Sequence, residues 1–184
     1  MEKIKELNFS QDSHEYTYDS KRIPSVTQVI NFIYGPRNIS DFYLQRGAEV
    51  HAIINSYIRK TLIEESIDDQ LKGYFMAVKR FFRWTGKTYA FSEGSFYSKR
   101  GYAGTRDLEL IDRDWIIDFK TGDPDDKRDA MQLIAYADSN RNYELYNVYL
   151  KDNGNYRIIK RLYDRVVYSI FLAGVSILNY TRRF

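Results

Sequence analysis

Two aspartates and a lysine in the middle of the chain have the types and spacing needed to bind a cation and act on a phosphate. Asp118 and Lys120 stand in the run Trp115-Ile-Ile-Asp-Phe-Lys-Thr-Gly122, and Asp107 lies eleven residues before Asp118. In a strand, residues i and i+2 point to one face, so Asp118 and Lys120 project together. A carboxylate and an ammonium on an otherwise apolar strand are costly to desolvate, which indicates a local purpose.

A tight turn between Asp107 and Asp118 predicts antiparallel pairing that brings the two carboxylates together. They would repel each other unless a cation lay between them. Oxygen ligands suit Mg²⁺ or Mn²⁺, and such an ion polarises a phosphate and lowers the pKa of bound water. Lys120 would then orient or deprotonate that water, or stabilise the pentavalent charge. For an isolated Asp-x-Lys, a solvent-facing salt bridge is the commoner explanation, so the interpretation depends on its neighbours.

The helix expected over 125–139 carries three hydrogen-bonding side chains at helical spacing. Gln132 and Tyr136 are four residues apart and share a face, and Arg128 precedes them on the same stripe. A guanidinium, an amide and a phenol in a row suit a phosphate backbone. Taken alone, the row fits a solvated helix face better. The apolar residues of this helix can serve the core: Met131, Leu133, Ile134, Ala135 and Ala137.

Two further residues gain meaning only from this context. His51 lies on a helical stripe with Ile54 and Ile58, where a histidine is more often a core or boundary residue than a ligand. Glu93 lies in the first expected strand of the sheet, where a solvent-facing role is the simpler explanation.

The hydrophobic pattern divides the chain into a helical part and a sheet part. Helices are expected after Ser25, which forms a capping box with Gln28, after Ser40, and after Ser66 with Asp69. A short strand is expected over 15–19. The period then changes to two, and antiparallel strands are expected over 87–99, 101–111 and 114–121. After the helix over 125–139 come a hairpin formed by 144–151 and 156–161 and a closing helix over 163–183.

This order predicts an α/β (α+β) fold in which helices cover a central mixed β-sheet. The 184 residues suit a single domain, with a helical part over about 1–85, a sheet core over about 86–161 and a closing helix over about 162–184.

Composition excludes several classes of site. The chain has no cysteine, so disulfides, thiolate zinc sites and a cysteine nucleophile are excluded. The 28 Lys and Arg exceed the 25 Asp and Glu by only three, which does not by itself signal nucleic-acid binding. The N-terminus lacks an apolar signal core, and no apolar run spans a bilayer, so an intracellular, cytoplasmic protein is expected.

Together the motifs resemble the PD-(D/E)XK nuclease superfamily, specifically its RecB-like exonuclease branch. That branch includes the RecB nuclease domain, CRISPR-associated RecB-type nucleases and the mitochondrial genome maintenance exonuclease. The resemblance rests on five motifs in order: His51, Glu93, Gly104-x-x-Asp107, Asp118-x-Lys-Thr-Gly122 and Gln132-x-x-x-Tyr136. They cover nearly half of the chain. Pro24-Ser-Val-Thr27 also resembles a segment common in phage members of this branch.

The resemblance implies a Mg²⁺- or Mn²⁺-dependent deoxyribonuclease of DNA repair, recombination or phage biology. It implies metal ligation by His51, Asp107, Asp118 and the Phe119 carbonyl, with Glu93 as an accessory acid. Lys120 would serve the attacking water, while Gln132 and Tyr136, with Arg128 on the same stripe, would hold the DNA. Many relatives carry four cysteines for an iron–sulfur cluster, which this chain lacks.

Three functions remain open on the sequence. The leading one is an exonuclease acting on single-stranded DNA ends. The resemblance to the RecB-like branch implies it, and the 30 aromatic residues include Tyr and Phe that can stack on unpaired bases. A structure- or sequence-specific endonuclease on the same core is the second. The third is a non-catalytic nucleic-acid-binding module, which the presence of Asp107, Asp118 and Lys120 argues against. The polarity of digestion and the oligomeric state are not encoded in a readable motif.

Overall fold

The computed structural model describes residues 6–10, 15–86, 90–138 and 140–182, and two sheets organise them. The small sheet is antiparallel, in the order β1 (Leu7–Ser10), β2 (Glu15–Tyr18) and β3 (Lys21–Ile23). The central sheet has the order β4 (Ala90–Ser98), β5 (Tyr102–Leu110), β6 (Trp115–Lys120), β7 (Glu144–Leu150) and β8 (Tyr156–Arg161). Only the β6–β7 pair of this sheet is parallel. The expected mixed sheet is therefore confirmed.

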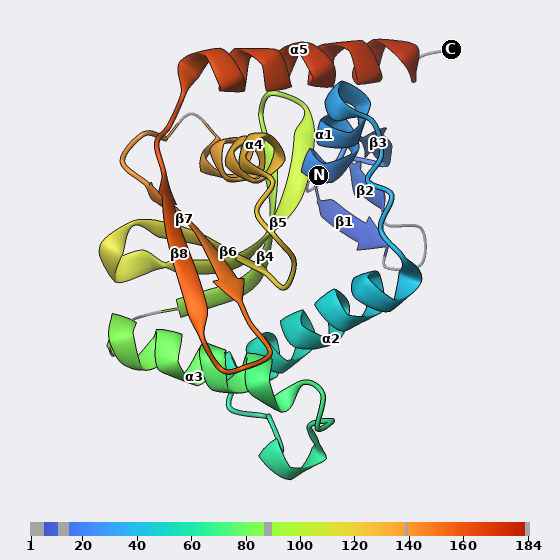
Figure 1. Cartoon of the computed structure of the whole chain (residues 1–184). Helices are drawn as coiled ribbons and strands as arrows, with labels where there is room; N and C mark the ends of the chain where they lie inside the picture. Colours follow the sequence, from blue (N-terminus) through green and yellow to red (C-terminus); the bar gives the residue numbers. More distant parts are fainter. Residues whose placement is uncertain (1–5, 11–14, 87–89, 139, 183–184) are drawn as a thin grey trace, which may run out of the picture.

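Helices cover both faces of the central sheet (Figure 1). One face carries α1 (Val26–Tyr34), α4 (Asp126–Ala137) and α5 (Arg165–Thr181). The other carries α2 (Asp41–Ile58) and α3 (Lys72–Thr85). Two short 3₁₀ turns, η1 (Glu64–Ser66) and η2 (Ile111–Arg113), connect elements. This arrangement confirms the expected α/β class.

Strand β6 shows why its sequence alternates. Ile116 packs into the core formed with α1, α4 and α5, whereas Ile117 and Phe119 pack into the core formed with α2 and α3. Asp118 and Lys120 share the face of Ile116. Helix α4 connects the parallel pair β6 and β7, and the hydrogen bond from Lys120 to Gln132 shows that it covers this face. The crossover thus brings the polar residues of α4 over those of β6.

The helix expected to open at Ser66 instead opens at Lys72, after Leu71 as N-cap, so this prediction is wrong. The Ser66 hydroxyl donates back to the Ile63 carbonyl at 2.7 Å and closes the η1 turn, so it does not cap α3. The first turn of α3 lies against the β7–β8 turn, where a Cβ on Gly73 would be 1.5 Å from the Asp152 carbonyl oxygen. Tertiary packing therefore determines where this helix begins.

The remaining expectations agree in type, and several differ in length. Ser25 and Gln28 form the expected capping box, while Ser40 precedes α2 without a side-chain capping bond. Of the small sheet, the sequence predicts only the strand that corresponds to β2; β1 is equally short but lacks its clear alternation, and β3 has only three residues. Parts of the expected strand over 87–99 and of the helices over 125–139 and 163–183 lie outside the described residues, at 87–89, 139 and 183.

Candidate active site

The site forms where the antiparallel ladder between β5 and β6 ends. The last paired residues are Leu108 and Ile117, so Asp107 and Asp118 come next on their strands. The Asp107 side chain continues the pairing, because its Oδ2 accepts the Phe119 amide hydrogen at 2.8 Å. The expectation that antiparallel pairing brings the two aspartates together agrees with this geometry.

Asp118 is a buried carboxylate, with only 1% of its surface exposed. Its two oxygens lie 2.9 and 2.7 Å from the Lys120 Nζ, and its Oδ2 also accepts from the Asn147 amide at 2.9 Å. Burial raises the pKa of Asp118 to about 6, although the neighbouring Lys120 ammonium lowers it. The Asp107 charge raises it further. A second cation beside these carboxylates would therefore be favoured electrostatically.

Lys120 is held in its charged form. Burial alone would lower its pKa, but the charges of Asp118 and Asp107 outweigh that effect and raise it. The ammonium also donates to Gln132 Oε1 at 2.9 Å. An ammonium whose protons are engaged in this way donates hydrogen bonds and neutralises charge, so it is a poor proton acceptor.

Helix α4 continues the polar chain. Gln132 Nε2 donates to the Tyr136 hydroxyl at 2.8 Å, so Asp118, Lys120, Gln132 and Tyr136 form one connected network. Burial raises the pKa of Tyr136 well above its ordinary value, which keeps the hydroxyl neutral. A Cβ on Gly104 would lie 3.0 Å from the Tyr136 ring. The glycine of the Gly-x-x-Asp motif therefore permits the close approach of α4 to β5.

His51 from α2 and Glu93 from β4 lie near the point where the pairing of β5 with β6 ends. The His51 Nδ1 lies 3.6 Å from Asp107 Oδ2. Glu93 accepts from the Asn55 amide at 2.6 Å, and Asn55 lies one helical turn after His51. The β4–β5 ladder is interrupted at Glu93, opposite Asp107, and Glu93 has a φ of 51°. This left-handed conformation is unusual for a non-glycine residue and marks a constrained position.

The donor atoms suit a hard divalent cation, but they are not gathered into a complete site. Carboxylate oxygens from Asp107 and Asp118 and a backbone carbonyl are typical ligands of Mg²⁺ or Mn²⁺. Within the described parts of the chain, no three His, Asp or Glu side chains cluster closely enough to hold a metal ion. Lys120 and Asn147 occupy the Asp118 oxygens instead. The residues therefore fit such an ion in chemistry, and binding it requires these contacts to rearrange.

A cleft of about 1160 Å³ opens beside these residues. His51, Phe119 and Lys120 line it together with the first half of α2 and the loop that follows β6. Its other cationic lining residues are Arg37, Arg46 and Lys151. Arg37 pairs with Asp125 and Asp129, and Lys151 pairs with Asp123. Most of the positive charge in the cleft is thus already balanced.

Arg46 differs from the other cations of the cleft. Its guanidinium carbon lies 4.8 Å from the Tyr43 ring centre and 5.3 Å from that of Tyr74. It donates to the Thr121 carbonyl at 3.1 Å, and its buried Nε has no hydrogen-bond partner. Among the described residues, no carboxylate forms an ion pair with it. Arg46 is therefore the cleft cation most available to an anionic ligand, and the sequence analysis did not single it out.

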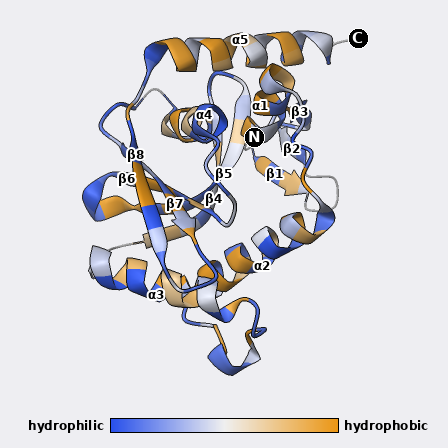
Figure 2. Cartoon of the chain, viewed as in Figure 1, coloured by the Kyte–Doolittle hydropathy of each residue, from blue (hydrophilic) through white to orange (hydrophobic). Residues whose placement is uncertain are grey.

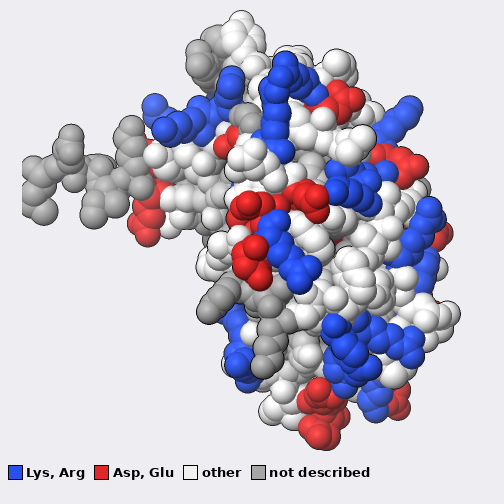
Figure 3. All heavy atoms as spheres, turned by 90° about the vertical axis from the view of Figure 1, so that its left-hand side faces the viewer, with Lys and Arg blue, Asp and Glu red and all other residues white. Residues whose placement is uncertain are grey.

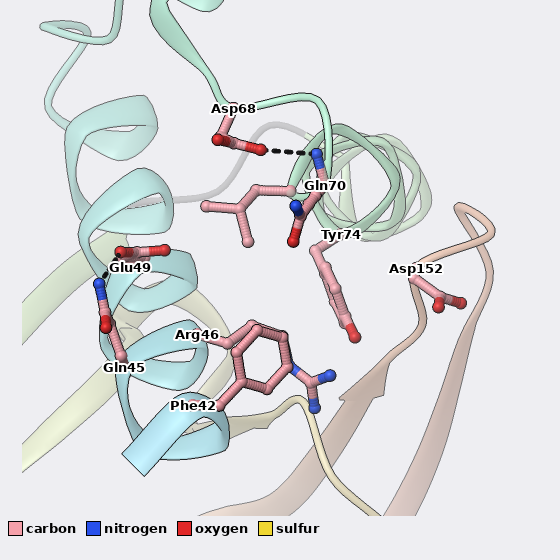
Figure 4. A pocket seen from close by; sticks show the side chains of 9 residues that line it. Phe42, Gln45, Arg46, Glu49, Asp68, Gln70, Tyr74 and Asp152 are labelled. Carbon is pink, nitrogen blue, oxygen red and sulfur yellow. Dashed lines mark hydrogen bonds between the residues drawn. The ribbon is translucent and has the colours of Figure 1, made fainter.

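A side pocket of about 520 Å³ adjoins the cleft and shares Arg46, Tyr74 and Asp152 with it. Figure 4 shows Phe42, Gln45, Arg46 and Glu49 projecting from α2, with Tyr74 and Asp152 across from them. Three carboxylates and one cation line this pocket, whereas three carboxylates and four cations line the cleft. The side pocket is thus less suited to a phosphate than the cleft.

Arg128 is not brought into the polar network. Its guanidinium binds the Asn31 side chain and the carbonyls of Tyr34 and Gly35, at the end of α1. It also pairs with Asp125 at 3.3 Å. These contacts hold the end of α1 against the start of α4.

The sequence analysis missed Asn147, which lies beside Asp118 on the parallel strand β7. It is fully buried, donates to Asp118 and accepts from Arg161 Nε at 2.8 Å. The sequence does contain a signal for this residue, because Asn147 lies within the largely apolar run 144–150. Burying its amide there is costly without a hydrogen-bond partner, as it is for the Asp118 carboxylate. Its partner could not be read from the sequence, since a parallel register across a helical crossover is not local.

One face of the molecule carries mixed charges. On the face in Figure 3, Lys and Arg lie side by side with Asp and Glu, without one broad field of a single sign. This face as a whole would therefore attract an anionic ligand only weakly.

In the described part of the chain, no helix has the length and apolar character required to cross a membrane.

Comparison with known proteins yields a likeness of fold. No family model and no curated protein matches the chain. Among solved structures, it is similar to an alkaline exonuclease from Laribacter hongkongensis, with 16% identity and a TM-score of 0.50 over 85% of this chain and 80% of that one. A protein named SSO0001 shares 15% identity over 84% of each chain, with a TM-score of 0.36. The central sheet and flanking helices are therefore consistent with a nuclease-like core.

Proposed function

We propose that the protein is a metal-dependent deoxyribonuclease that hydrolyses phosphodiester bonds as an exonuclease on single-stranded DNA ends. The observation that carries the proposal is the polar network at the end of β6. Asp118, Lys120, Gln132 and Tyr136 form one connected network beside Asp107, and Lys120 opens into a cleft. A solvent-facing salt bridge would explain neither the burial of Asp118 nor the second carboxylate, Asp107, next to it.

Asp107 and Asp118, with His51 and the Phe119 carbonyl, would hold Mg²⁺ or Mn²⁺. When bound, such an ion polarises the phosphate and lowers the pKa of a coordinated water. Glu93 is proposed as an accessory acid, because its constrained backbone places it opposite Asp107 and beside the Asn55 amide. Asn147 would keep the Asp118 carboxylate in position when Lys120 moves away from it.

Lys120 would donate hydrogen bonds to the attacking water or to the phosphate, and its charge would stabilise the pentavalent transition state. The raised pKa of Lys120 favours this role over removal of a proton from water. Gln132 and Tyr136 would hold a non-bridging phosphate oxygen or the water, because the Gln132 amide accepts from Lys120 and the Tyr136 hydroxyl, which accepts from Gln132, keeps its own hydrogen to donate. Arg128, the remaining residue of this stripe, would support substrate binding indirectly by fixing the end of α1.

Exposed aromatic side chains support the choice of single strands. Phe42 and Tyr43 are 61% and 52% exposed on the first turn of α2. Tyr43 lines the cleft and Phe42 the side pocket. Unpaired bases stack on such rings with little sequence preference. The fold likeness to an alkaline exonuclease agrees with action on DNA ends.

The proposal is tested with end-labelled linear and circular single-stranded DNA in Mg²⁺, Mn²⁺ or EDTA. We expect loss of the linear substrate alone, abolished by EDTA and by Lys120→Ala. The end whose label is released first gives the polarity. Asp118→Asn should also be inactive, whereas Asp112→Asn, an exposed carboxylate in the η2 turn, should retain full activity.

Other results would redirect the assignment. Cutting of the circle would favour an endonuclease on the same core. Binding of DNA without hydrolysis under any metal condition would favour a non-catalytic binding module. Unchanged hydrolysis by Lys120→Ala or Asp118→Asn would remove the proposed site altogether.

A further inference from the structure

The outer side of α5 carries an unusual surface. The helix has 17 residues and a single charged one, Arg165, although 29% of the whole chain is charged. A surface helix normally places charged and polar residues on the side that faces solvent. Here Val166 is 67% exposed, and Ile170 and Ile177 are 48% and 47% exposed. Figure 2 shows α5 largely in orange and white at the edge of the molecule.

The exposed apolar residues follow a regular row. Their positions are separated by steps of four, three, four and three: Val166, Ile170, Ala173, Ile177 and Tyr180. This is the spacing of the seam between two paired helices. The two serines beside the row already have hydrogen-bond partners within the helix. Ser169 donates to the Arg165 carbonyl and Ser176 to the Leu172 carbonyl. Both hydroxyls can therefore be covered at little cost.

The buried side of α5 holds the helix on its own molecule. The opposite side of the helix is filled by Phe171 and Val175, which are buried in the core with α1 and α4. Gly174 brings α5 so close to α1 that a Cβ there would lie 3.0 Å from Val29. The Asp164 side chain caps the helix by accepting from the backbone amides of Val166 and Val167. These contacts hold α5 in place, with the row on its outer side.

We propose that this row is a self-association surface, on which a second copy of the chain docks its own α5 in antiparallel orientation. The row is nearly symmetric about Ala173, with Val166 seven residues before it and Tyr180 seven after it. Ile170 and Ile177 lie three before and four after. A two-fold axis at Ala173 would pair Ile170 with Ile177 of the second copy and Val166 with its Tyr180. Such self-complementarity is what an isologous dimer requires.

The size of the row fits a second copy, and the row itself carries no charge to be desolvated. At its edge, Arg165 of one helix would lie at the end of the other, where the helix dipole favours cations but Arg182 is also present. The Arg182 guanidinium donates to Gln28 of its own molecule, so this pair of like charges lies outside the row and weakens the dimer without blocking it. A helix of this length is about 25 Å long. With roughly 100 Å² accessible on each large side chain of the row, a dimer would bury on the order of 1,000 Å², the lower limit of specific interfaces. We therefore expect a weak, concentration-dependent dimer.

The dimer would leave both clefts open. None of the described residues that line the cleft or its side pocket belongs to α5. Self-association is thus independent of the proposed nuclease activity, and the two can be tested separately.

Cysteine cross-linking provides a sharp test, because the chain has no cysteine of its own. Ala173→Cys would lie on the two-fold axis and should form a disulfide-linked dimer under mild oxidation. Val166→Cys is the matched control, because its counterpart in an antiparallel pair is about 21 Å away. It should not cross-link alone, but should do so when mixed with Tyr180→Cys. A dimer of Val166→Cys alone, or none of Ala173→Cys, would overturn the proposed pairing.

Sedimentation velocity from about 1 to about 200 µM tests the association in the native chain, over the range in which a small interface operates. The wild type should approach twice 21.9 kDa, and Ile170→Glu should remain a monomer with unchanged melting temperature. Ile63→Glu, an equally apolar residue that is 66% exposed near η1, should dimerise like the wild type. A wild type that remains a monomer over this whole range would overturn the proposal. A wild type that binds lipid vesicles without dimerising, with the binding lost in Ile170→Glu, would overturn it as well.

Discussion

Helices α2 and α5 have nearly equal lengths and opposite uses. Of the 18 residues of α2, only Val50 and Ile54 are buried. Its polar side chains reach Glu93 in β4, Asp107 in β5 and the Thr121 carbonyl just after β6. Of the 17 residues of α5, four are buried, and its exposed side is almost uncharged. Helix α2 therefore buries few residues and supplies polar groups to the cleft. Helix α5 packs into the core, and none of its described residues lines the cleft.

This contrast separates stability from chemistry. A polar side chain aimed at a cleft cannot at the same time fill the core, so α2 contributes less apolar burial per residue. The rigid α4 lies between the two roles, because one side of it is core and the other carries Gln132 and Tyr136. Substitutions in the two outer helices should therefore have effects of different kinds.

The largest effect on stability is expected from Phe171→Ala in α5. The ring is fully buried and lies 4.9 Å from the Tyr102 ring centre, so its removal leaves a cavity and should cost about 3–5 kcal/mol of unfolding free energy. Urea unfolding followed by circular dichroism measures this loss. The control Val166→Ala, exposed on the same helix, should lose less than about 0.5 kcal/mol. Equal losses in the two variants would contradict the division of α5 into two faces.

Asp129→Ala in α4 should cost about 3 kcal/mol, because it removes a fully bonded buried carboxylate. Its oxygens accept from Arg37 at 3.0 Å, Tyr149 at 2.7 Å and the Asp125 amide at 2.9 Å. The loss is measured by thermal unfolding. Lys127→Ala, which changes an exposed side chain on the same turn, is the control and should remain close to the wild type. A small loss for Asp129→Ala would mean that this network does not anchor α4.

His51→Ala in α2 should lower nuclease activity by about 100-fold while changing stability little, if His51 supports the metal. Its side chain is 32% exposed and meets Asp107 without filling the core. Activity is measured across a Mg²⁺ or Mn²⁺ titration, in which excess metal should restore part of the rate. Glu49→Ala, on the same helix but bonded only to Gln45 in the described structure, should keep full activity. A fall in melting temperature as large as the fall in activity would instead indicate a structural histidine.

Arg46→Gln should weaken binding of single-stranded DNA by about tenfold and lower the salt slope of binding by about 0.7, the contribution of one phosphate. Fluorescence anisotropy with the inactive Lys120→Ala background measures both quantities. Arg46→Lys should keep the salt slope and lose the stacking between Tyr43 and Tyr74. Arg59→Gln, the cation at the other end of α2, should leave both unchanged.

Local patterns were sufficient for much of this molecule. The period of two around Asp118 and Lys120, and the spacing of four between Gln132 and Tyr136, predicted which side chains share a face. The hydrogen bonds of Lys120 to Asp118 and to Gln132 agree with both patterns. Where an end was decided by contacts distant in sequence, local patterns failed. The start of α3 follows its packing against the β7–β8 turn, and the serine pattern at Ser66 carried no information about that turn.

By itself, the sequence determined the order and type of most elements and the polar side chains that share a face, because hydrophobic period and capping act over a few residues. Only the tertiary structure decided which of those groups meet. Arg128 was drawn to the end of α1, Asn147 was brought to Asp118 by a parallel register, and Arg46 was left between two tyrosines without a carboxylate. These outcomes depend on distant segments packing together, and the free energy of each contact depends on burial that no local pattern encodes.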